Sequence, residues 1–462
     1  MKEFDVAIIG SGPGGYVAAI RAGIVGLSAA LIEKDPFLGG TCLHRGCIPT
    51  KALLHTADLF DEIRHAKDHG IEVRGASLDI VQVHARKQAV VDKLAKGVAF
   101  LCKKRKVEVF TGTGSFADPN TIRIAGPSDT TIRARNVIIA TGSTPSHLPH
   151  IKPDGKSIID SDMILKPGGV PKSLAVIGSG AVGTEFASVF QSFGSQVHLI
   201  ELLPRLLPIE DDECSQQLER ALKARGIQCY ASTEVTEAKL APNGVVLTLR
   251  KDGATSTLEV ETVLVATGRR PVLEGLNHDK IGVAMNGRFV AVDETMRTNV
   301  TNVYAIGDVL ATPALAHVAS REGILAVDHM AGRPAHPIDY LAVPNCTYSN
   351  PEVASVGLTE RAAREQGHDV RVGKFPFSAI SKAAILGDTT GFVKIVADQR
   401  YDEVLGVHIV GPRATELIAE AVLGKHLETT VEAIAHTIHA HPTLAEAMME
   451  AAHAVYGEAI HI

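Results

Sequence analysis

The stretch that decides the fold is Val6-Ala7-Ile8-Ile9-Gly10-Ser11-Gly12-Pro13-Gly14-Gly15, close to the start of the 462-residue chain. Its apolar residues predict a buried strand, and a second strand, Ala29–Ile32, ends in Glu33. A glycine-rich turn between strand and helix, followed by an acid about 20 residues on, is typical of a dinucleotide site. The first glycine permits a tight turn, the second lets N–H groups approach a pyrophosphate, and the third allows the helix to pack on the strand. We predict such a site at Gly10, Gly12 and Gly15, with Glu33 binding ribose hydroxyls.

The same pattern occurs a second time, because Val6–Asp35 can be laid on Leu174–Leu203 with an offset of 168 residues. In the second copy Leu174–Ile177 leads into Gly178-Ser179-Gly180-Ala181-Val182-Gly183, and the strand Gln196–Ile200 ends in Glu201. In both copies the acid lies 23 positions after the first glycine. Glycine turns in a sheet without a nucleotide are the alternative, but the repeated context favours two sites. The second site is predicted at Gly178, Gly180, Gly183 and Glu201.

Composition bounds the class of protein. At ~150 residues per domain the chain is long enough for about three domains. Apolar residues make up 45% and charged residues 21%, as in globular proteins. The net charge of −6, with no basic run interleaved with aromatics, disfavours a nucleic-acid partner. No segment has the length of a membrane span or the pattern of a secretory signal, and the cysteines do not form a disulfide framework, so we expect a cytoplasmic protein without a membrane partner.

Further strands divide the chain. Asn136–Gly142 and Thr262–Gly268 are apolar strands stopped by Ala-Thr-Gly, and Asn302–Asp308 is a buried strand that delivers an acid at its carboxyl end. From about residue 336 strands and helices alternate in an α+β texture. The expected fold class is α/β, with two Rossmann-like dinucleotide-binding domains and a C-terminal α+β domain. The expected boundaries are 1–143 and 269–335 for the first nucleotide-binding domain, 144–268 for the second, and 336–462 for the C-terminal domain.

A pair of cysteines follows the first fingerprint in the run Gly40-Thr41-Cys42-Leu43-His44-Arg45-Gly46-Cys47, with Lys51 one turn later. Positions five apart in an ideal helix lie ~8–9 Å from each other, beyond the ~7 Å limit for a disulfide. A redox pair therefore needs a distorted helix, and Gly46 is the expected place. Cys47 and Lys51 share a helix face, so a ligand at Cys47 also feels the ammonium. Two unrelated buried cysteines are the alternative.

Near the other end, His441-Pro442-Thr443-Leu444-Ala445-Glu446 places a histidine before a helix and a carboxylate in its first turn. Together they form a possible acid–base unit. Two alternatives stay open: a capping box made by Thr443 and Glu446, and a metal site at His436, His439 and His441, although no further ligand completes that set.

These motifs, in this order, give the whole chain a resemblance to the pyridine nucleotide–disulfide oxidoreductases, and within them to the branch that oxidises dihydrolipoamide. The resemblance rests on the FAD fingerprint, Thr-Cys-x4-Cys-x-Pro-x-Lys, the NAD fingerprint with Glu185, Ala305-Ile306-Gly307-Asp308, and His441-Pro442-Thr443-x-x-Glu446.

The resemblance implies a relay from a dithiol through a Cys42–Cys47 disulfide and FAD to NAD. Cys42 would exchange with substrate and Cys47 would contact the flavin. His441, oriented by Glu446, would be the base and would reach the disulfide of the other subunit. Lys51 would lie by the flavin and pair with Glu185. The implied cofactor contacts are Gly40, Thr41, Thr141, Gly142, Asp308 and Ala316 for FAD, and Gly268 beside the second fingerprint for NAD.

The partners implied are a second copy of the chain, which would bind through residues 336–462 as an α+β dimerisation domain, and the lipoyl domain of a 2-oxoacid dehydrogenase or related complex. The apolar helix predicted over Leu444–Val455 suits a buried subunit contact, and the alternative is an ordinary core helix of the same chain. Other functions stay open: reduction of another small disulfide, or a flavin-binding subunit without catalysis.

Two features narrow the subclass. Glu201 repels a 2′-phosphate, and the residues after it, Leu202-Leu203-Pro204-Arg205, carry one cation. We therefore predict NAD rather than NADP. The loop between the cysteines is Leu-His-Arg-Gly, where this family more often has Leu-Asn-Val-Gly. A cation at Arg45 is expected to favour thiolates and ease reduction of the disulfide, unless it is only a solvated surface charge.

Overall fold

The computed structural model describes residues 1–127 and 129–462, which form two compact units. Unit 1 consists of Met1–Ala52, His84–Ser146 and Arg269–Tyr340. Unit 2 consists of Leu53–Val83, His147–Gly268 and Leu341–Ile462. The finer boundaries expected at residues 143, 268 and 335 stay predictions.

The main sheet of unit 1 carries the first fingerprint. Its strands are β1 (Lys2–Ile9), β2 (Ala29–Glu33), β3 (Glu108–Thr111), β4 (Thr113–Asp118), β5 (Thr121–Ala125), β6 (Thr130–Ile139) and β19 (Val303–Ala305). The order is β3-β2-β1-β6-β5-β4, with β19 also pairing with β6. The pairs from β3 to β6 and the β6–β19 pair are parallel, whereas β5 and β4 are antiparallel. Val6–Ile9 is at most 4% exposed because both faces of the sheet are covered, which explains its unbroken apolar run.

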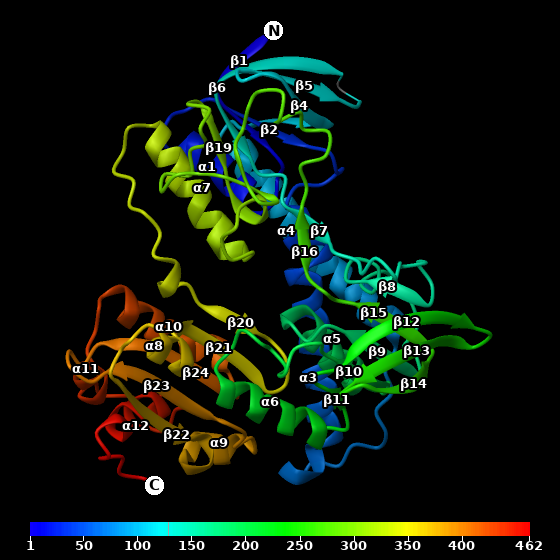
Figure 1. Ribbon diagram of the computed structural model, residues 1–462, viewed down its shortest axis with the longest axis vertical. Helices are drawn as coiled ribbons and strands as arrows, with labels where there is room; N and C mark the ends of the chain where they lie inside the picture. Colours follow the sequence, from blue (N-terminus) through cyan, green and yellow to red (C-terminus); the bar gives the residue numbers. More distant parts are fainter. Residues whose placement is uncertain (128) are drawn as a thin grey trace. The chain divides into compact units, whose positions relative to one another are not determined.

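Helices cover this sheet. Helices α1 (Pro13–Ile24) and α7 (Ala316–Met330) lie side by side (Figure 1). A short helix, η2 (Gly307–Val309), follows β19 and contacts α7. The other elements with residues in unit 1 are α2 (Gly40–Arg45), the start of α3 (Cys47–Arg64), α4 (Ile80–Lys104), β7 (Ser143–Pro145), β16 (Arg269–Pro271), β17 (Met285–Asn286) and β18 (Phe289–Val290).

Unit 2 contains a second parallel sheet, which carries the second fingerprint. Its strands are β8 (Ile158–Asp160), β9 (Ser173–Ile177), β10 (Gln196–Ile200), β11 (Gln228–Tyr230) and β15 (Thr262–Val265), in the order β11-β10-β9-β15-β8. An antiparallel sheet follows, made of β12 (Glu234–Ala241), β13 (Gly244–Lys251) and β14 (Ala254–Val260). The helices are α5 (Ala181–Ser192) and α6 (Asp212–Ala224).

The C-terminal part of unit 2 is built on an antiparallel sheet in the order β20-β21-β24-β23-β22. Its strands are β20 (Asn345–Thr347), β21 (Glu352–Gly357), β22 (Val370–Pro376), β23 (Phe392–Asp398) and β24 (Val404–Gly411). The helices with it are α8 (Glu360–Glu365), α9 (Ser381–Leu386), α10 (Ala414–His426), α11 (Val431–Ala435) and α12 (Glu446–Val455). The predicted fold class is confirmed: two sheets, each with parallel strands that carry a fingerprint, precede an α+β region.

The last helix corrects one expectation. Ala447, Met448, Ala451 and Ala452 of α12 are 0% exposed within a single chain, because α12 packs on β22 and β23. The apolar face of this helix is therefore core, and the inference that this face forms a buried subunit contact is wrong. Nor does Thr443 cap it, since the helix follows Ala445.

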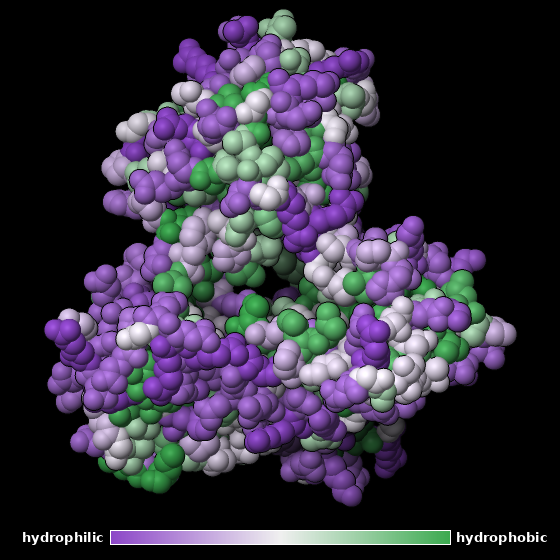
Figure 2. Space-filling view, viewed as in Figure 1, coloured by the Kyte–Doolittle hydropathy of each residue, from purple (hydrophilic) through white to green (hydrophobic). Residues whose placement is uncertain are grey.

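The surface seen in Figure 2 is mainly hydrophilic, with apolar side chains dispersed over it. No helix in the part of the chain that the structure describes combines the length and apolar character that a bilayer crossing needs.

Candidate active site

The first fingerprint forms a strand–turn–helix unit. Gly10 follows β1 with φ 107°, a conformation that side-chain-bearing residues rarely adopt. Gly12 precedes α1, and a Cβ built on it meets no atom within 4 Å, so a ligand can approach its backbone. Gly15 has the opposite surroundings: its Cβ would lie 1.9 Å from the carbonyl oxygen of Gly10. Helix and strand therefore pack too closely for any other residue there.

Glu33 is held at the end of β2 by three donors. Its Oε2 accepts from the backbone N–H of Ser11 at 2.9 Å and from the Ser11 hydroxyl at 2.5 Å, and its Oε1 accepts from the N–H of Asp35 at 2.9 Å. Only 7% of Glu33 is exposed. The carboxylate is fixed at the carboxyl edge of the sheet, beside the open N-terminus of α1.

The second fingerprint repeats this arrangement in unit 2. Gly178 has φ 100°, and a Cβ on Gly183 would lie 1.9 Å from the Gly178 carbonyl oxygen. Glu201 accepts from the N–H and hydroxyl of Ser179 at 2.8 Å each and from the N–H of Leu203 at 2.9 Å. Gly180, like Gly12, meets no atom within 4 Å of a built Cβ.

Both sites fit a dinucleotide. At each, a parallel sheet delivers a fixed carboxylate for ribose, and a helix N-terminus with an unobstructed glycine offers N–H donors to a pyrophosphate. The residues present therefore suit a dinucleotide in each unit, and the assignment of FAD to unit 1 and NAD to unit 2 stays a prediction.

The cysteine pair lies where the helix is interrupted. Helix α2 ends at Arg45, Gly46 caps it, and α3 begins at Cys47. This break brings the Cys42 and Cys47 side chains into hydrogen-bond contact. That hydrogen bond, followed by burial, raises the pKa of Cys42, while the Lys51 charge opposes the rise. The interruption expected at Gly46 is thus observed.

Gly40 and Thr41 open α2 beside the first fingerprint. Gly40 adopts φ 57°, and its built Cβ would lie 2.6 Å from the Cα of Gly12. The helix that carries Cys42 therefore begins against the glycine turn that is predicted to bind the pyrophosphate. Thr141 follows β6 and donates its hydroxyl to the carbonyl oxygen of Val272 at 2.6 Å.

Asp308 lies in η2, within a polar chain that spans three segments of unit 1. The Ser143 hydroxyl donates to Asp308 Oδ2 at 2.5 Å, and it accepts from Arg269 Nε at 2.7 Å. Arg269 Nη2 also donates to the carbonyl oxygen of Ser143 at 2.9 Å. Because the serine hydroxyl has one proton, the arginine fixes its direction toward the aspartate.

A second network supports the same turn from α7. Glu322 is 0% exposed and accepts from the N–H of Gly307 at 2.6 Å, from the Thr312 hydroxyl at 2.8 Å and from the Tyr340 hydroxyl at 2.9 Å. Burial raises the pKa of Glu322, and these three donors limit the rise. Ala316 is the first residue of α7, the helix that carries Glu322.

In unit 2, the other predicted nucleotide residues take these positions. Glu185 lies in α5, is 3% exposed, and accepts from the N–H of Tyr348 at 3.1 Å. Gly268 follows β15 with φ 103°. Arg205, the cation nearest Glu201 in sequence, pairs with Asp212 at 2.5 Å. The Arg205 charge is therefore already balanced by a carboxylate rather than offered to a 2′-phosphate, which agrees with a preference for NAD.

His441 and Glu446 form a pair at the start of α12. The ring Nδ1 lies 2.9 Å from Glu446 Oε1, and Oε2 of the same carboxylate accepts from the N–H of Thr443 at 2.9 Å. Burial opposes ionisation, but the Thr443 N–H and the His441 ring hold the pKa of Glu446 below its usual range. The histidine side chain is 70% exposed, with its ring oriented by the carboxylate.

The predicted site residues thus fall into groups within each unit. Cys42, Cys47, Lys51 and the first fingerprint belong to unit 1, whereas Glu185, His441 and the second fingerprint belong to unit 2. The pairing of Lys51 with Glu185 and the approach of His441 to the cysteines stay predictions.

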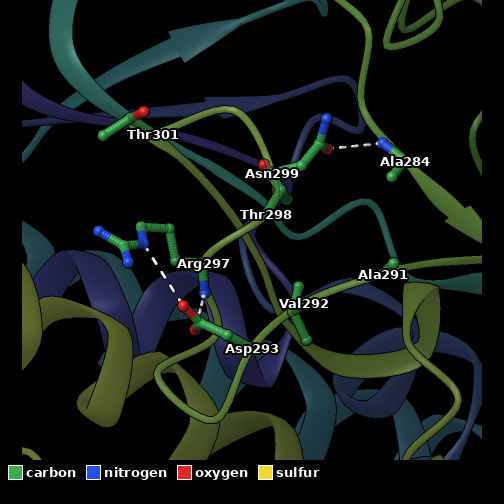
Figure 3. Close-up of a pocket in the computed structure, with 8 residues that line it drawn as sticks. All are labelled: Ala284, Ala291, Val292, Asp293, Arg297, Thr298, Asn299 and Thr301. Atoms are coloured by element: carbon green, nitrogen blue, oxygen red, sulfur yellow. Dashed lines mark hydrogen bonds and ion pairs between the residues drawn. The ribbon is translucent and has the colours of Figure 1, made fainter.

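Unit 1 also has a cavity of about 470 Å³, and none of the residues that line it belongs to these motifs (Figure 3). Asp293 there accepts from the N–H of Arg297, and Asn299 Oδ1 accepts from the N–H of Ala284 at 2.7 Å. Its polar side chains thus brace neighbouring loops. In residues 1–127 and 129–462, no group of three His, Cys, Asp or Glu side chains is placed to hold a metal ion.

Sequence reasoning missed several supporting residues. Ser11 and Ser179, which fix the two ribose acids, occupy the same place in both copies, and this coincidence was available as a signal. Ser143 and Arg269 each follow an Ala-Thr-Gly, so the internal repeat also marked them. Glu322 carried no comparable signal, because its partners are a backbone amide and two distant hydroxyls.

Two family models match the chain. The model described as pyridine nucleotide-disulphide oxidoreductase matches residues 4–323, and the dimerisation domain of the same description matches residues 343–452. The second match supports a homodimer.

Individual proteins agree with this result. Dihydrolipoyl dehydrogenase from Bacillus subtilis is 47% identical over 476 residues, which cover 99% of this chain and 99% of that protein. The mitochondrial dihydrolipoyl dehydrogenase from Pisum sativum is 43% identical over 467 residues, which cover 100% of this chain and 93% of that protein. The crystal structure of LpdA from Mycobacterium tuberculosis matches with a TM-score of 0.90 and 27% identity, covering 98% of this chain and 99% of that one.

Proposed function

The chain belongs to the pyridine nucleotide-disulphide oxidoreductase family, and within it we propose that the protein is a dihydrolipoyl dehydrogenase that uses FAD and NAD. The observation that carries this proposal is the contact between the Cys42 and Cys47 side chains, directly after a dinucleotide fingerprint in unit 1. A dithiol substrate needs such a pair of thiols as its exchange partner.

The overall reaction balances as dihydrolipoamide plus NAD⁺ giving lipoamide, NADH and one proton. A substrate thiolate attacks Cys42 of the Cys42–Cys47 disulfide, which breaks the S–S bond and forms a mixed disulfide between substrate and Cys42. The second substrate thiolate then attacks the substrate sulfur of that bond. Lipoamide leaves, and the protein pair is a dithiol that holds two electrons.

His441 is the proposed base for these steps. Only a thiolate is nucleophilic, so each substrate thiol must lose its proton. The imidazole can accept that proton at Nε2, since Nδ1 faces Glu446. The carboxylate orients the ring and stabilises the imidazolium, and its pKa below the usual range keeps it ionised for this role. We assign His441 to the site of the partner subunit, consistent with the dimerisation domain.

FAD supplies the two-electron step between the dithiol and NAD when it is bound. The chain's residues would hold it: the glycines of the first fingerprint would bind the pyrophosphate, Glu33 the ribose, and Asp308 the ribityl hydroxyls. Lys51 lies one turn after Cys47 and favours its thiolate, as its effect on Cys42 indicates. NAD would bind at the second fingerprint, where Glu201 would accept hydrogen bonds from its ribose.

Two other functions are less well supported. A reductase of another small disulfide would share this relay, but the relatives from Bacillus subtilis and Pisum sativum are named for dihydrolipoamide chemistry. A flavin subunit without catalysis would not need a cysteine pair together with an oriented histidine. As partner we propose the lipoyl domain of a 2-oxoacid dehydrogenase or related complex, and as location the cytoplasm, since the cysteines form no disulfide framework.

The test is NADH formation from dihydrolipoamide by Cys47→Ser, compared with the wild type. We expect a loss of at least ~10³-fold, because the relay has lost one of its sulfurs. Bound FAD should be retained, since Cys47 is not a fingerprint residue. Undiminished turnover in the variant would overturn the proposal, as would wild-type protein that oxidises no dihydrolipoamide. Cys229→Ser is the matched control: burial raises the pKa of Cys229 to about 12, so it is not expected to react.

A further inference from the structure

The loop between the two cysteines contains His44 and Arg45, which the proposed relay does not use. Both side chains of this short helix, α2, contact the segment that joins β2 to α2, residues 34–39. Arg45 Nη2 lies 2.7 Å from Asp35 Oδ2. His44 Nε2 donates to the carbonyl oxygen of Leu38 at 2.9 Å, and the His44 ring stacks on Phe37 with centroids 5.9 Å apart. The helix that carries Cys42 is therefore fastened to residues 34–39 at several points.

Residues 34–39 are themselves tied to the first nucleotide site. The N–H of Asp35 donates to Glu33 Oε1, the proposed ribose ligand, at 2.9 Å. At the other end, the N–H of Gly39 donates to the carbonyl oxygen of Ser11 at 3.0 Å, and Ser11 also binds Glu33. A continuous path of hydrogen bonds thus leads from Arg45 through Asp35 to Glu33.

The Asp35 partner changes what Arg45 can do to the cysteines. An isolated cation in the loop would favour thiolates. Here an aspartate faces the guanidinium at 2.7 Å and offsets much of its field. The contacts of Arg45 are consequently better suited to hold α2 in place than to attract a thiolate.

We infer that Arg45 is a positioning residue that fastens the Cys42 helix to the Glu33 end of the FAD site, and so couples the cysteine redox equilibrium to FAD binding. The inference rests on the proposed Cys42–Cys47 exchange. In the disulfide form the S–S bond holds the two sulfurs together. In the dithiol form only the surrounding structure does, and Arg45 and His44 restrain the Cys42 helix.

Loosening this restraint gives the dithiol form more conformations and leaves the disulfide form nearly unchanged. Reduction therefore becomes easier when the Arg45–Asp35 contact is lost. An electrostatic role predicts the opposite sign for the arginine, because removal of a cation disfavours thiolates and makes reduction harder. The two mechanisms can be separated by the direction of the change.

The experiment equilibrates the holoenzyme with glutathione buffers without oxygen. The exchange is enzyme disulfide plus two glutathione thiols giving enzyme dithiol plus glutathione disulfide. Acid quenching, alkylation and mass spectrometry of the Cys42–Cys47 peptide report the fraction reduced. For Arg45→Val and for Asp35→Ala we expect the equilibrium constant to shift toward dithiol by about 3- to 10-fold, or about 14–30 mV at 29.6 mV per tenfold change.

Matched variants sharpen this measurement. Arg45→Lys keeps a cation opposite Asp35 and should restore most of the wild-type equilibrium. Arg135→Val removes an arginine paired with Asp5 at 3.3 Å elsewhere in unit 1, and should change nothing. A shift toward disulfide in Arg45→Val with a shift toward dithiol in Asp35→Ala would overturn the inference in favour of electrostatics. Unchanged equilibria in both would overturn it in favour of a solvated surface charge.

The second arm measures FAD release, followed by fluorescence after dilution. The Arg45–Asp35 contact also restrains the segment whose Asp35 N–H binds Glu33, so a variant that loosens this path should hold FAD less firmly. We expect release about 3- to 10-fold faster in Arg45→Val and Asp35→Ala, and unchanged in Arg135→Val. Unaltered release in the first two would contradict the coupling.

Failure of this inference and of the proposed function can be told apart. A wild-type pair that stays dithiol at every glutathione ratio would contradict the Cys42–Cys47 relay itself. A wild-type pair that titrates, with variants that titrate identically, would contradict only the role of Arg45.

Discussion

The two fingerprint copies make corresponding hydrogen bonds as far as Gly39 in the first copy and Leu207 in the second, and they differ after these residues. Ser11, Glu33 and Asp35 of the first copy correspond to Ser179, Glu201 and Leu203 of the second, with the same donors on the acid. The match extends to the returning chain, since Gly39 N–H donates to the Ser11 carbonyl oxygen at 3.0 Å and Leu207 N–H to that of Ser179 at 3.1 Å.

After this point the copies differ in what they attach to the nucleotide site. In the first, Gly40 opens the short helix α2, which carries Cys42 against the glycine turn. In the second, the chain continues to Asp211, whose side chain caps the surface helix α6. In the proposed function the first module is therefore the redox centre and the second binds a mobile cofactor, because only the first is followed by a cysteine helix.

The largest expected effect comes from breaking the shared geometry in one copy at a time. Gly183→Ala places a Cβ 1.9 Å from a backbone oxygen, so α5 or β9 must move, at a cost of about 3 kcal/mol. NAD binding measured by titration should fall by about 100-fold, with FAD retained. Gly15→Ala is the counterpart and should release FAD. If either substitution weakened both cofactors equally, the copies would not be independent sites.

Removal of Glu201 or Glu33, the two carboxylates proposed to bind ribose, should have the next largest effect. Glu201→Ala is expected to weaken NAD by about 1–3 kcal/mol and to relax the rejection of NADP, because charge-assisted hydrogen bonds and a repulsive charge are lost together. Steady-state KM values for NAD and NADP measure this. Glu33→Ala provides the comparison, since it should affect FAD retention and leave the NAD/NADP preference as it was. An unchanged preference in Glu201→Ala would mean that the 2′ position is recognised by other residues.

A smaller effect is expected from the support that the first copy receives through Glu322. Tyr340→Phe removes one donor to this buried carboxylate and should lower the free energy of unfolding by about 1 kcal/mol near neutral pH.

The pH dependence gives this prediction its sign. Glu322 has a folded pKa above the ordinary value of 4.5, because burial disfavours its anion, so its contribution to stability falls as pH rises from 4.5 through the folded pKa. Loss of the Tyr340 donor raises that pKa further. The difference between variant and wild type should therefore be smaller below pH 4.5 than at pH 7, as measured by denaturant unfolding. A pH-independent difference would show that Tyr340 acts by packing alone.

The smallest expected effect concerns the second copy. Asp212→Asn removes the carboxylate that pairs with Arg205 and should improve NADP binding by less than about 1 kcal/mol, because the pair is partly exposed. Arg361→Leu, which removes the other cation near Asp212 at 3.5 Å, serves as the control and should leave cofactor preference unchanged. Worse NADP binding in Asp212→Asn would contradict the expectation that Arg205, once released from Asp212, can bind the 2′-phosphate of NADP.

Much of the site was predictable because its signals are local. The glycine at position 10 adopts a positive φ, and the one at position 15 has no room for a Cβ, so the turn itself demands these residues. The break at Gly46 followed from the reach of a disulfide compared with helix geometry. The error at α12 arose because an apolar helix face looks the same whether its partner is β22 of its own chain or a second subunit.

By itself the sequence determined the two nucleotide modules, the cysteine pair and the order of strands and helices, since spacing and periodicity depend on neighbouring residues. Only the tertiary structure decided which distant groups meet. Arg269 reaches Ser143 across 126 positions and so directs a hydroxyl toward Asp308. Asp35 pairs with Arg45, and we infer that this contact restrains the helix that carries Cys42. Such pairs depend on how the sheet brings its carboxyl ends together, and a polar side chain carries no local mark of the partner that satisfies it.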